Sequence, residues 1–181
     1  MLVALFSALL VVLGLIPPIP LPIVPVPITL QTFGVMLAGL ILGPTRGGLV
    51  LLLYVGLALL GLPVLPGGRA GLAVLAGPTA GFLLGMVPGA ILTGWLARQH
   101  QRSAGVGVGV GVVRDTVRCA LAAIVGGIVL VYLVGIPWLA FVTKMGLVKA
   151  CWVMLVFVPG DLIKALVAAA VAQRIRRLNM V

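Results

Sequence analysis

The sequence predicts an all-α membrane protein with six transmembrane helices. The chain of 181 residues is 63% hydrophobic and only 8% charged, with a mean hydropathy of +1.38. Soluble proteins carry roughly 25% charged residues, so this composition indicates an integral membrane protein. No charged side chain precedes Arg46, and the basic residues fall mostly in short breaks between apolar runs, as topology determinants do. We expect a single integral membrane domain over residues 1–181.

The first expected helix covers residues 1–16. It lacks the positively charged start and the cleavage site of a secretory signal, and two prolines follow it directly. Ala4 and Ala8 lie one turn apart, a spacing that lets another helix approach closely in lipid. Chance spacing in an alanine-rich chain is the alternative. The six prolines between Pro17 and Pro27 then predict an extended, polyproline-like loop, because proline fixes φ and removes a donor.

Apolar runs between Gly- and Pro-rich breaks predict three more helices, over residues 28–42, 49–62 and 79–97. A tight turn over residues 43–48 joins the first two, and a long loop from Pro63 to Pro78 joins the last two. A proline inside the last of these helices predicts a kink.

Polar residues near these helices have more than one interpretation. Thr29, Gln31 and Thr32 open the second helix, where they either cap it or line a cavity. His100 stands alone in a basic loop, without a partner for metal binding. The Gly/Val alternation from Gly105 to Gly111 lacks the Gly-Lys-Ser/Thr ending of a phosphate-binding loop, so it is interpreted as a flexible linker.

A fifth helix is expected over residues 119–134, followed by a loop from Gly135 to Lys149. In that loop, Trp138 fits either an aromatic residue at the membrane interface or a cover for a ligand. The sixth helix is expected to contain the sequence Val158-Pro-Gly-Asp-Leu-Ile-Lys164 and to end in a cluster of arginines.

Asp161 and Lys164 carry the strongest functional signal. Asp161 is one of only two acidic residues in the chain, and a charge inside a membrane segment is costly unless it is paired or solvated. Pro159 and Gly160 directly precede it, so we expect Asp161 to be the N-cap of a helix, with Lys164 at its third position. Residues three apart share a helix face, so both charges point the same way.

The basic residues also predict the orientation of the chain. With both termini in the cytoplasm, eight arginines fall on the inner side and only Arg69, Lys144 and Lys149 on the outer side, which is a clear positive-inside bias. The three long loops then lie on the extracellular face, above Asp161 and Lys164. We expect a ligand pocket at the extracellular side, capped by these loops.

The residue types exclude several classes of function. The sequence holds no Ser/His/Asp set, metal-ligand cluster or phosphate-binding loop, so neither an enzyme nor a bound metal or cofactor is expected. The net charge of +10 is not gathered on one solvated face, which argues against nucleic acid as a partner. A proton or ion path would need more titratable groups within the membrane. Binding of a small polar molecule in an apolar cage fits best.

Five motifs in order along the chain resemble the BioY family. These proteins are the substrate-binding (S) components of energy-coupling factor (ECF) transporters for biotin. The resemblance implies high-affinity biotin capture by a multi-pass protein of a bacterial or archaeal plasma membrane. The motifs are Thr29-Leu-Gln-Thr-Phe33, Leu42-Gly-Pro-x-Arg-Gly47, Gly68-x-x-Gly-Leu72, Gly77-Pro-Thr-Ala-Gly-Phe82 and, most specific, Pro159-Gly-Asp-Leu-Ile-Lys164.

The resemblance also implies roles for individual residues. Asp161 and Lys164 would bind the polar groups of biotin. Ala4 and Ala8 match the signature by which such components dock on a transmembrane coupling subunit, and two separate ATPase subunits would hydrolyse ATP. Phe82 stands where the family often has tyrosine. The remaining expected substrate-site residues are Gly77, Thr79, Phe82, Gln31 and Trp138.

Two alternatives remain open at this point. The substrate could be another small vitamin. Alternatively, the chain could be a packing subunit in which Asp161 and Lys164 form only a buried salt bridge, since buried pairs can fix helix packing without adding net stability.

Overall fold

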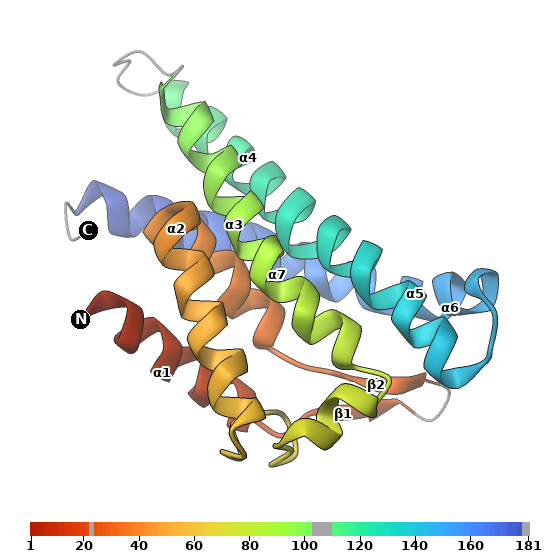
Figure 1. The fold of residues 1–181 in the computed structure, drawn as a ribbon. Coiled ribbons are helices and arrows are strands. Elements are labelled where there is room, and N and C mark those ends of the chain that lie inside the picture. The colour runs from red at the N-terminus through yellow and green to blue at the C-terminus, as the bar shows by residue number, and fades with distance from the viewer. Residues whose placement is uncertain (22–23, 103–109, 179–181) are drawn as a thin grey trace.

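The computed structural model describes residues 1–21, 24–102 and 110–178, and helices make up most of them. Most of the expected linker from Gly105 to Gly111 lies outside the described residues, and so does the side chain of His100. The elements, shown in Figure 1, are α1 (Leu2–Leu15), β1 (Ile19–Leu21), β2 (Val24–Ile28), α2 (Gln31–Leu59), the 3₁₀ helix η1 (Leu72–Ala76), α3 (Ala80–Arg102), α4 (Val110–Ile124), the π-helix η2 (Val125–Leu130), α5 (Val131–Thr143), α6 (Leu147–Met154), the 3₁₀ helix η3 (Leu155–Phe157) and α7 (Val158–Arg177).

Within the described ranges, four helical stretches are long and apolar enough to cross a membrane. α1 is a further apolar helix of 14 residues. The expectation of a helical membrane protein is therefore confirmed at this level. The four stretches are Gln31–Leu59, Ala80–Gln99, Arg114–Thr143 and Leu147–Arg176.

The first of these stretches is bent back on itself at Gly43. Gly43 has φ 79° and ψ −175°, outside the helical region, and a glycine tolerates this conformation without strain. A Cβ placed on Gly47 would lie 3.0 Å from the carbonyl oxygen of Ala38, which shows that the two halves of α2 run back along each other. The expected break is confirmed, but it is shorter than the six-residue turn, because Pro44 already suits the first position of the second half.

The expected loop from Gly135 to Lys149 is wrong. α5 continues through Gly135 and Pro137 to Thr143, and only residues 144–146 separate it from α6. Glycine and proline punctuate helices in water, but in lipid a broken helix exposes backbone groups that have no water to bond. Continuing the helix avoids that cost, so Trp138 lies on α5 and not on a loop.

The proline-rich segment is extended, as expected, but it is not a polyproline loop. β1 and β2 pair as antiparallel strands, with Ile19 opposite Ile28 and Leu21 opposite Val24. β2 is an edge strand of a two-stranded sheet, a position where proline is tolerated.

α3 packs along the bent α2 in the middle of the bundle. A Cβ on Gly94 would lie 2.5 Å from the backbone of Gly43 and Pro44, so the absence of a side chain there allows α3 to approach the bend. Both chain ends lie on one side of the molecule, and α6 lies on the opposite side (Figure 1).

Candidate ligand-binding site

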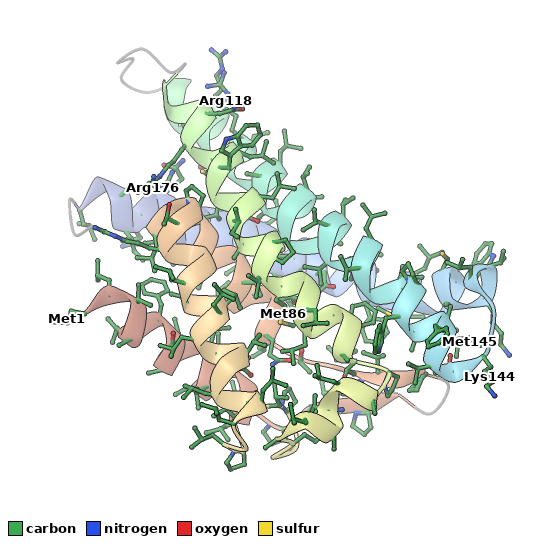
Figure 2. All side chains as sticks on the ribbon, in the orientation of Figure 1. Met1, Met86, Arg118, Lys144, Met145 and Arg176 are labelled. Carbon is green, nitrogen blue, oxygen red and sulfur yellow. The ribbon has the colours of Figure 1, made fainter. Side chains whose placement is uncertain are left out.

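A cavity opens between β2, the loop that follows α2, and helices α2, α3, α5 and α7. The empty space between these elements is about 660 Å³, a value that includes the open mouth. Met86, one of its lining residues, lies near the centre of the molecule in Figure 2. The walls are formed by Val26, Pro27, Thr29, Gln31, Thr32, Leu65, Pro66, Arg69, Val74, Thr79, Phe82, Leu83, Met86, Val131, Tyr132, Met154, Phe157, Asp161 and Lys164.

Asp161 lies in the first turn of α7 and is not an N-cap, so that expectation is wrong. α7 begins at Val158 with Phe157 as its N-cap, and Pro159 occupies the first turn. Proline suits that turn because its missing N–H would have no helical partner there. The Pro-Gly pair therefore starts α7 instead of interrupting a helix, and Asp161 lies near the middle of the rod formed by α6, η3 and α7.

A buried polar cluster surrounds this carboxylate. Asp161 is 4% exposed, and its Oδ1 lies 2.8 Å from Nζ of Lys164. The hydroxyl of Thr32 donates to the same oxygen at 3.0 Å, and Tyr132 donates to Oδ2 at 2.6 Å. Lys164 also donates to the carbonyl oxygen of Thr29 at 2.7 Å and to Thr32 at 3.2 Å. The shared helix face expected for Asp161 and Lys164 is confirmed.

The hydrogen-bonding capacity left in this cluster consists of acceptors. An ammonium group has three donors, and all three donors of Lys164 have partners within the protein. A carboxylate offers about four lone-pair sites, of which Asp161 uses three. The hydroxyl of Tyr132 donates its proton to Asp161 and so keeps its acceptor sites. The cluster can therefore receive N–H donors from a ligand without losing its own bonds.

The wall beside the cluster is apolar and tightly packed. The rings of Phe82 and Tyr132 meet edge to face, with centroids 6.1 Å apart and planes at 88°, a favoured geometry for aromatic pairs. A Cβ on Gly135 would overlap the ring of Phe82, so the absence of a side chain at this position of α5 makes room for the ring.

Gln31 joins the cavity to the loop after α2. Its amide nitrogen donates to the hydroxyl of Tyr54 at 2.6 Å, and that hydroxyl donates to the carbonyl oxygen of Val64 at 2.9 Å. Tyr54 is fully buried, so this chain of bonds fixes both the amide of Gln31 and the start of the loop.

Three further hydrogen bonds stabilise the loop. Arg69 donates from Nη1 to the hydroxyl of Thr79 at 3.2 Å and from Nε to the carbonyl oxygen of Pro66 at 3.1 Å. On the other side, the indole of Trp138 donates to the carbonyl oxygen of Gly77 at 3.0 Å. The loop is thus tied to the start of α3 and to α5.

The structure brings five of the seven expected substrate-site residues to the cavity wall: Asp161, Lys164, Gln31, Thr79 and Phe82. Gly77 and Trp138 are not among the lining residues of the described chain; they bond to each other instead. Sequence reasoning overlooked Tyr132 and Arg69. Tyr132 is one of only two tyrosines, and a polar aromatic inside an apolar span was the available signal.

The docking residues expected on α1 lie away from this cavity. α1 packs on α2 through Ser7, Leu10 and Gly14, and Ser7 donates to the carbonyl oxygen of Val50 at 3.2 Å. Ala4 and Ala8 are exposed on the remaining surface of the helix. Their small side chains leave this face of α1 open to close approach.

An apolar cavity with a buried acid–base pair, set within a bundle of membrane-length helices, defines a membrane-embedded binding protein for a small solute. The profile of the BioY family matches residues 1–180. This chain belongs to the BioY family.

Individual relatives agree with this assignment. The chain is 49% identical over 177 residues to the biotin transporter BioY of Rhizobium etli, with 96% of this chain and 90% of the relative covered. It is 43% identical over 183 residues to the biotin transporter BioY of Rhodobacter capsulatus, with the same coverage. A crystal structure of the S-component for biotin from an ECF-type ABC transporter superposes with a TM-score of 0.88 at 33% identity, covering 97% of this chain and 89% of that one.

Proposed function

We propose that this chain captures biotin within the membrane as the S component of an ECF-type importer. Family membership and the likeness to a biotin S-component support the assignment. The observation that carries it is the polar cluster around Asp161, placed at the wall of a cavity that is lined mostly by apolar side chains.

The chemistry of biotin matches the two parts of this cavity. Biotin has a ureido ring with two N–H donors, an apolar thioether ring and an aliphatic chain that ends in a carboxylate. The free acceptor sites of Asp161 and Tyr132 suit the ureido N–H groups, which form charge-assisted bonds with a carboxylate. Apolar side chains such as Met86 and Phe157 surround the thioether ring and the chain.

Gln31 completes the recognition of the ureido group. The side-chain amide of Gln31 has two N–H donors. One of them bonds to the hydroxyl of Tyr54, and the other has no partner among the described residues. That free donor suits the ureido carbonyl. Lys164 can bond to the same carbonyl only if it gives up one of its three present hydrogen bonds. The bond to Tyr54 holds the amide in place before the ligand arrives, which reduces the entropy lost on binding.

The chain is proposed to cross the membrane six times, as a single substrate-binding domain. The crossings are α1, the two halves of α2, α3, the rod of α4 to α5 and the rod of α6 to α7. Arg118 and Arg176 lie at one end of the molecule and Lys144 at the other (Figure 2). Because arginines gather at the first end, the positive-inside rule places both termini in the cytoplasm and the cavity mouth outside. The membrane is that of a bacterium or archaeon.

The partners proposed are one transmembrane coupling subunit and two ATPase subunits. Ala4 and Ala8 expose small side chains on α1, where a helix of the coupling subunit can approach closely. This chain performs no chemical step in the proposed cycle: it binds the vitamin and requires no cofactor, and ATP is hydrolysed by its partners.

Calorimetry with the detergent-purified protein tests the choice of vitamin. Biotin, thiamine, riboflavin and pantothenate are titrated under the same conditions. We expect biotin to bind at least a hundredfold more tightly than the others, because only its ureido ring presents paired N–H donors beside an apolar ring. Tighter binding of another vitamin would show that the substrate is wrong.

A further inference from the structure

We infer that Arg69 binds the carboxylate of the ligand at the mouth of the cavity, and that this contact selects the free acid over its neutral esters and amides. The inference rests on the proposed function, since it assigns the end of biotin that the buried cluster does not hold.

The charges that line the cavity do not balance. They are Asp161, Lys164 and Arg69, so one negative and two positive groups leave a net charge of +1. Asp161 and Lys164 neutralise each other at 2.8 Å. The only other acidic side chain in the sequence, Asp115, lies 3.9 Å from Arg118. The chain therefore has no side-chain carboxylate left for Arg69, and a ligand with one negative charge would supply it.

The guanidinium of Arg69 is held in place but only partly used. Its Nε donates to the carbonyl oxygen of Pro66 and its Nη1 to the hydroxyl of Thr79. A guanidinium carries five N–H donors, and the other three have no partner among the described residues. Two of these free donors, one on each terminal nitrogen, form the fork that binds a carboxylate through two parallel bonds.

Arg69 and Asp161 lie at different depths. Arg69 is exposed on the loop after α2, whereas Asp161 is 4% exposed. A ligand with its polar ring at Asp161 therefore extends its chain toward the mouth, where its carboxylate keeps contact with water and costs little to desolvate. The same exposure limits the strength of the ion pair, so we expect a selectivity of about five- to tenfold.

The test compares biotin with biotinamide and biotin methyl ester, which keep the ring system and the chain but carry no charge. Affinities are measured by calorimetry for the native protein, Arg69→Gln, Arg69→Lys and Arg46→Gln. Arg46→Gln is the matched control, because it makes the same change at an exposed arginine outside the cavity.

We expect the native protein and Arg46→Gln to prefer biotin over the amide and ester by about five- to tenfold. Arg69→Gln should lose this preference, because its affinity for biotin falls by more than its affinity for the amide, and Arg69→Lys should keep part of it. An unchanged preference in Arg69→Gln would overturn the inference. So would an equal loss for all three ligands, since that result assigns Arg69 only to holding the loop. If the native protein binds none of them, the proposed function itself fails.

Discussion

Replacing Asp161 with asparagine separates a ligand-binding role from a packing role. The substitution keeps the shape of the side chain but removes its charge. Lys164 then keeps its bonds to Thr29 and Thr32 but loses its counter-charge. Both the stability of the fold and the affinity for biotin are expected to fall, by different amounts and for different reasons.

The expected losses follow from the geometry. A charge-assisted hydrogen bond contributes about 1.5–3 kcal/mol, so losing the one between Asp161 and a ureido N–H weakens biotin binding by about 10- to 150-fold, at 1.4 kcal/mol per factor of ten. Removing one partner of a buried ion pair costs about 3–5 kcal/mol in stability. The side chain of Lys164 is 14% exposed, so we expect a cost of about 2–3 kcal/mol. That cost corresponds to a fall in melting temperature of about 4–12 °C.

The assay pairs calorimetry with thermal unfolding in detergent and adds a double variant. In Asp161→Asn with Lys164→Met no unpaired charge remains, so stability should return to within about 1 kcal/mol of the native protein. Biotin binding should stay lost. Asp115→Asn is the control, because it neutralises the only other acidic side chain, which is 40% exposed beside Arg118; it should change neither quantity.

The same double variant can refute the reasoning. If Asp161 and Lys164 form only a structural salt bridge, affinity will follow stability and return in the double variant. Native affinity in the folded double variant would therefore show that neither charge binds biotin.

Four other variants, one of them a control, test separate parts of the structure. Tyr132→Phe removes the 2.6 Å bond to the buried carboxylate but keeps the ring, so calorimetry should show biotin binding weakened by about 5- to 30-fold. The melting temperature should fall by about 3–12 °C, because a hydrogen bond to a charged group contributes about 1.5–3 kcal/mol. Gly43→Ala forces a side chain into a backbone conformation with positive φ and against the guanidinium of Arg98, and should lower the free energy of unfolding by about 1–3 kcal/mol. In Gly160→Ala the new Cβ meets nothing within 4 Å, so that variant should unfold like the native protein. Ala4→Trp with Ala8→Trp should abolish co-purification with the coupling subunit while leaving the biotin affinity of the isolated protein unchanged; retained co-purification would move the docking surface elsewhere.

The site residues that can be predicted from the sequence are those related by local spacing. Asp161 and Lys164 are three residues apart in a helix, so their shared face follows from helical geometry alone. Tyr132 is 29 residues from Asp161 in sequence, and its contact depends on how α5 packs on α7. No periodicity in the sequence specifies that packing. Arg69 was counted as a topology residue because nothing local shows that its loop turns toward the cavity.

Two of the errors in the fold concern proline or glycine in a helix, and the third concerns a strand pairing. Gly135 and Pro137 would end a helix in water, yet α5 passes through both, because in lipid its backbone groups have no other partners. Pro159 would likewise interrupt a helix if it lay in the helix interior, whereas it occupies the first turn of α7. In the proline-rich segment, the extended conformation followed from the fixed φ of proline, but the pairing of β1 with β2 is a contact between segments that composition does not encode.

A structure of the protein with biotin bound tests the central claim most directly. The account predicts the ureido nitrogens within about 3 Å of the Asp161 carboxylate, the thioether ring against the apolar wall and the carboxylate at Arg69. Biotin bound outside this cavity, or inside it with its ureido ring away from Asp161 and Lys164, would contradict the account.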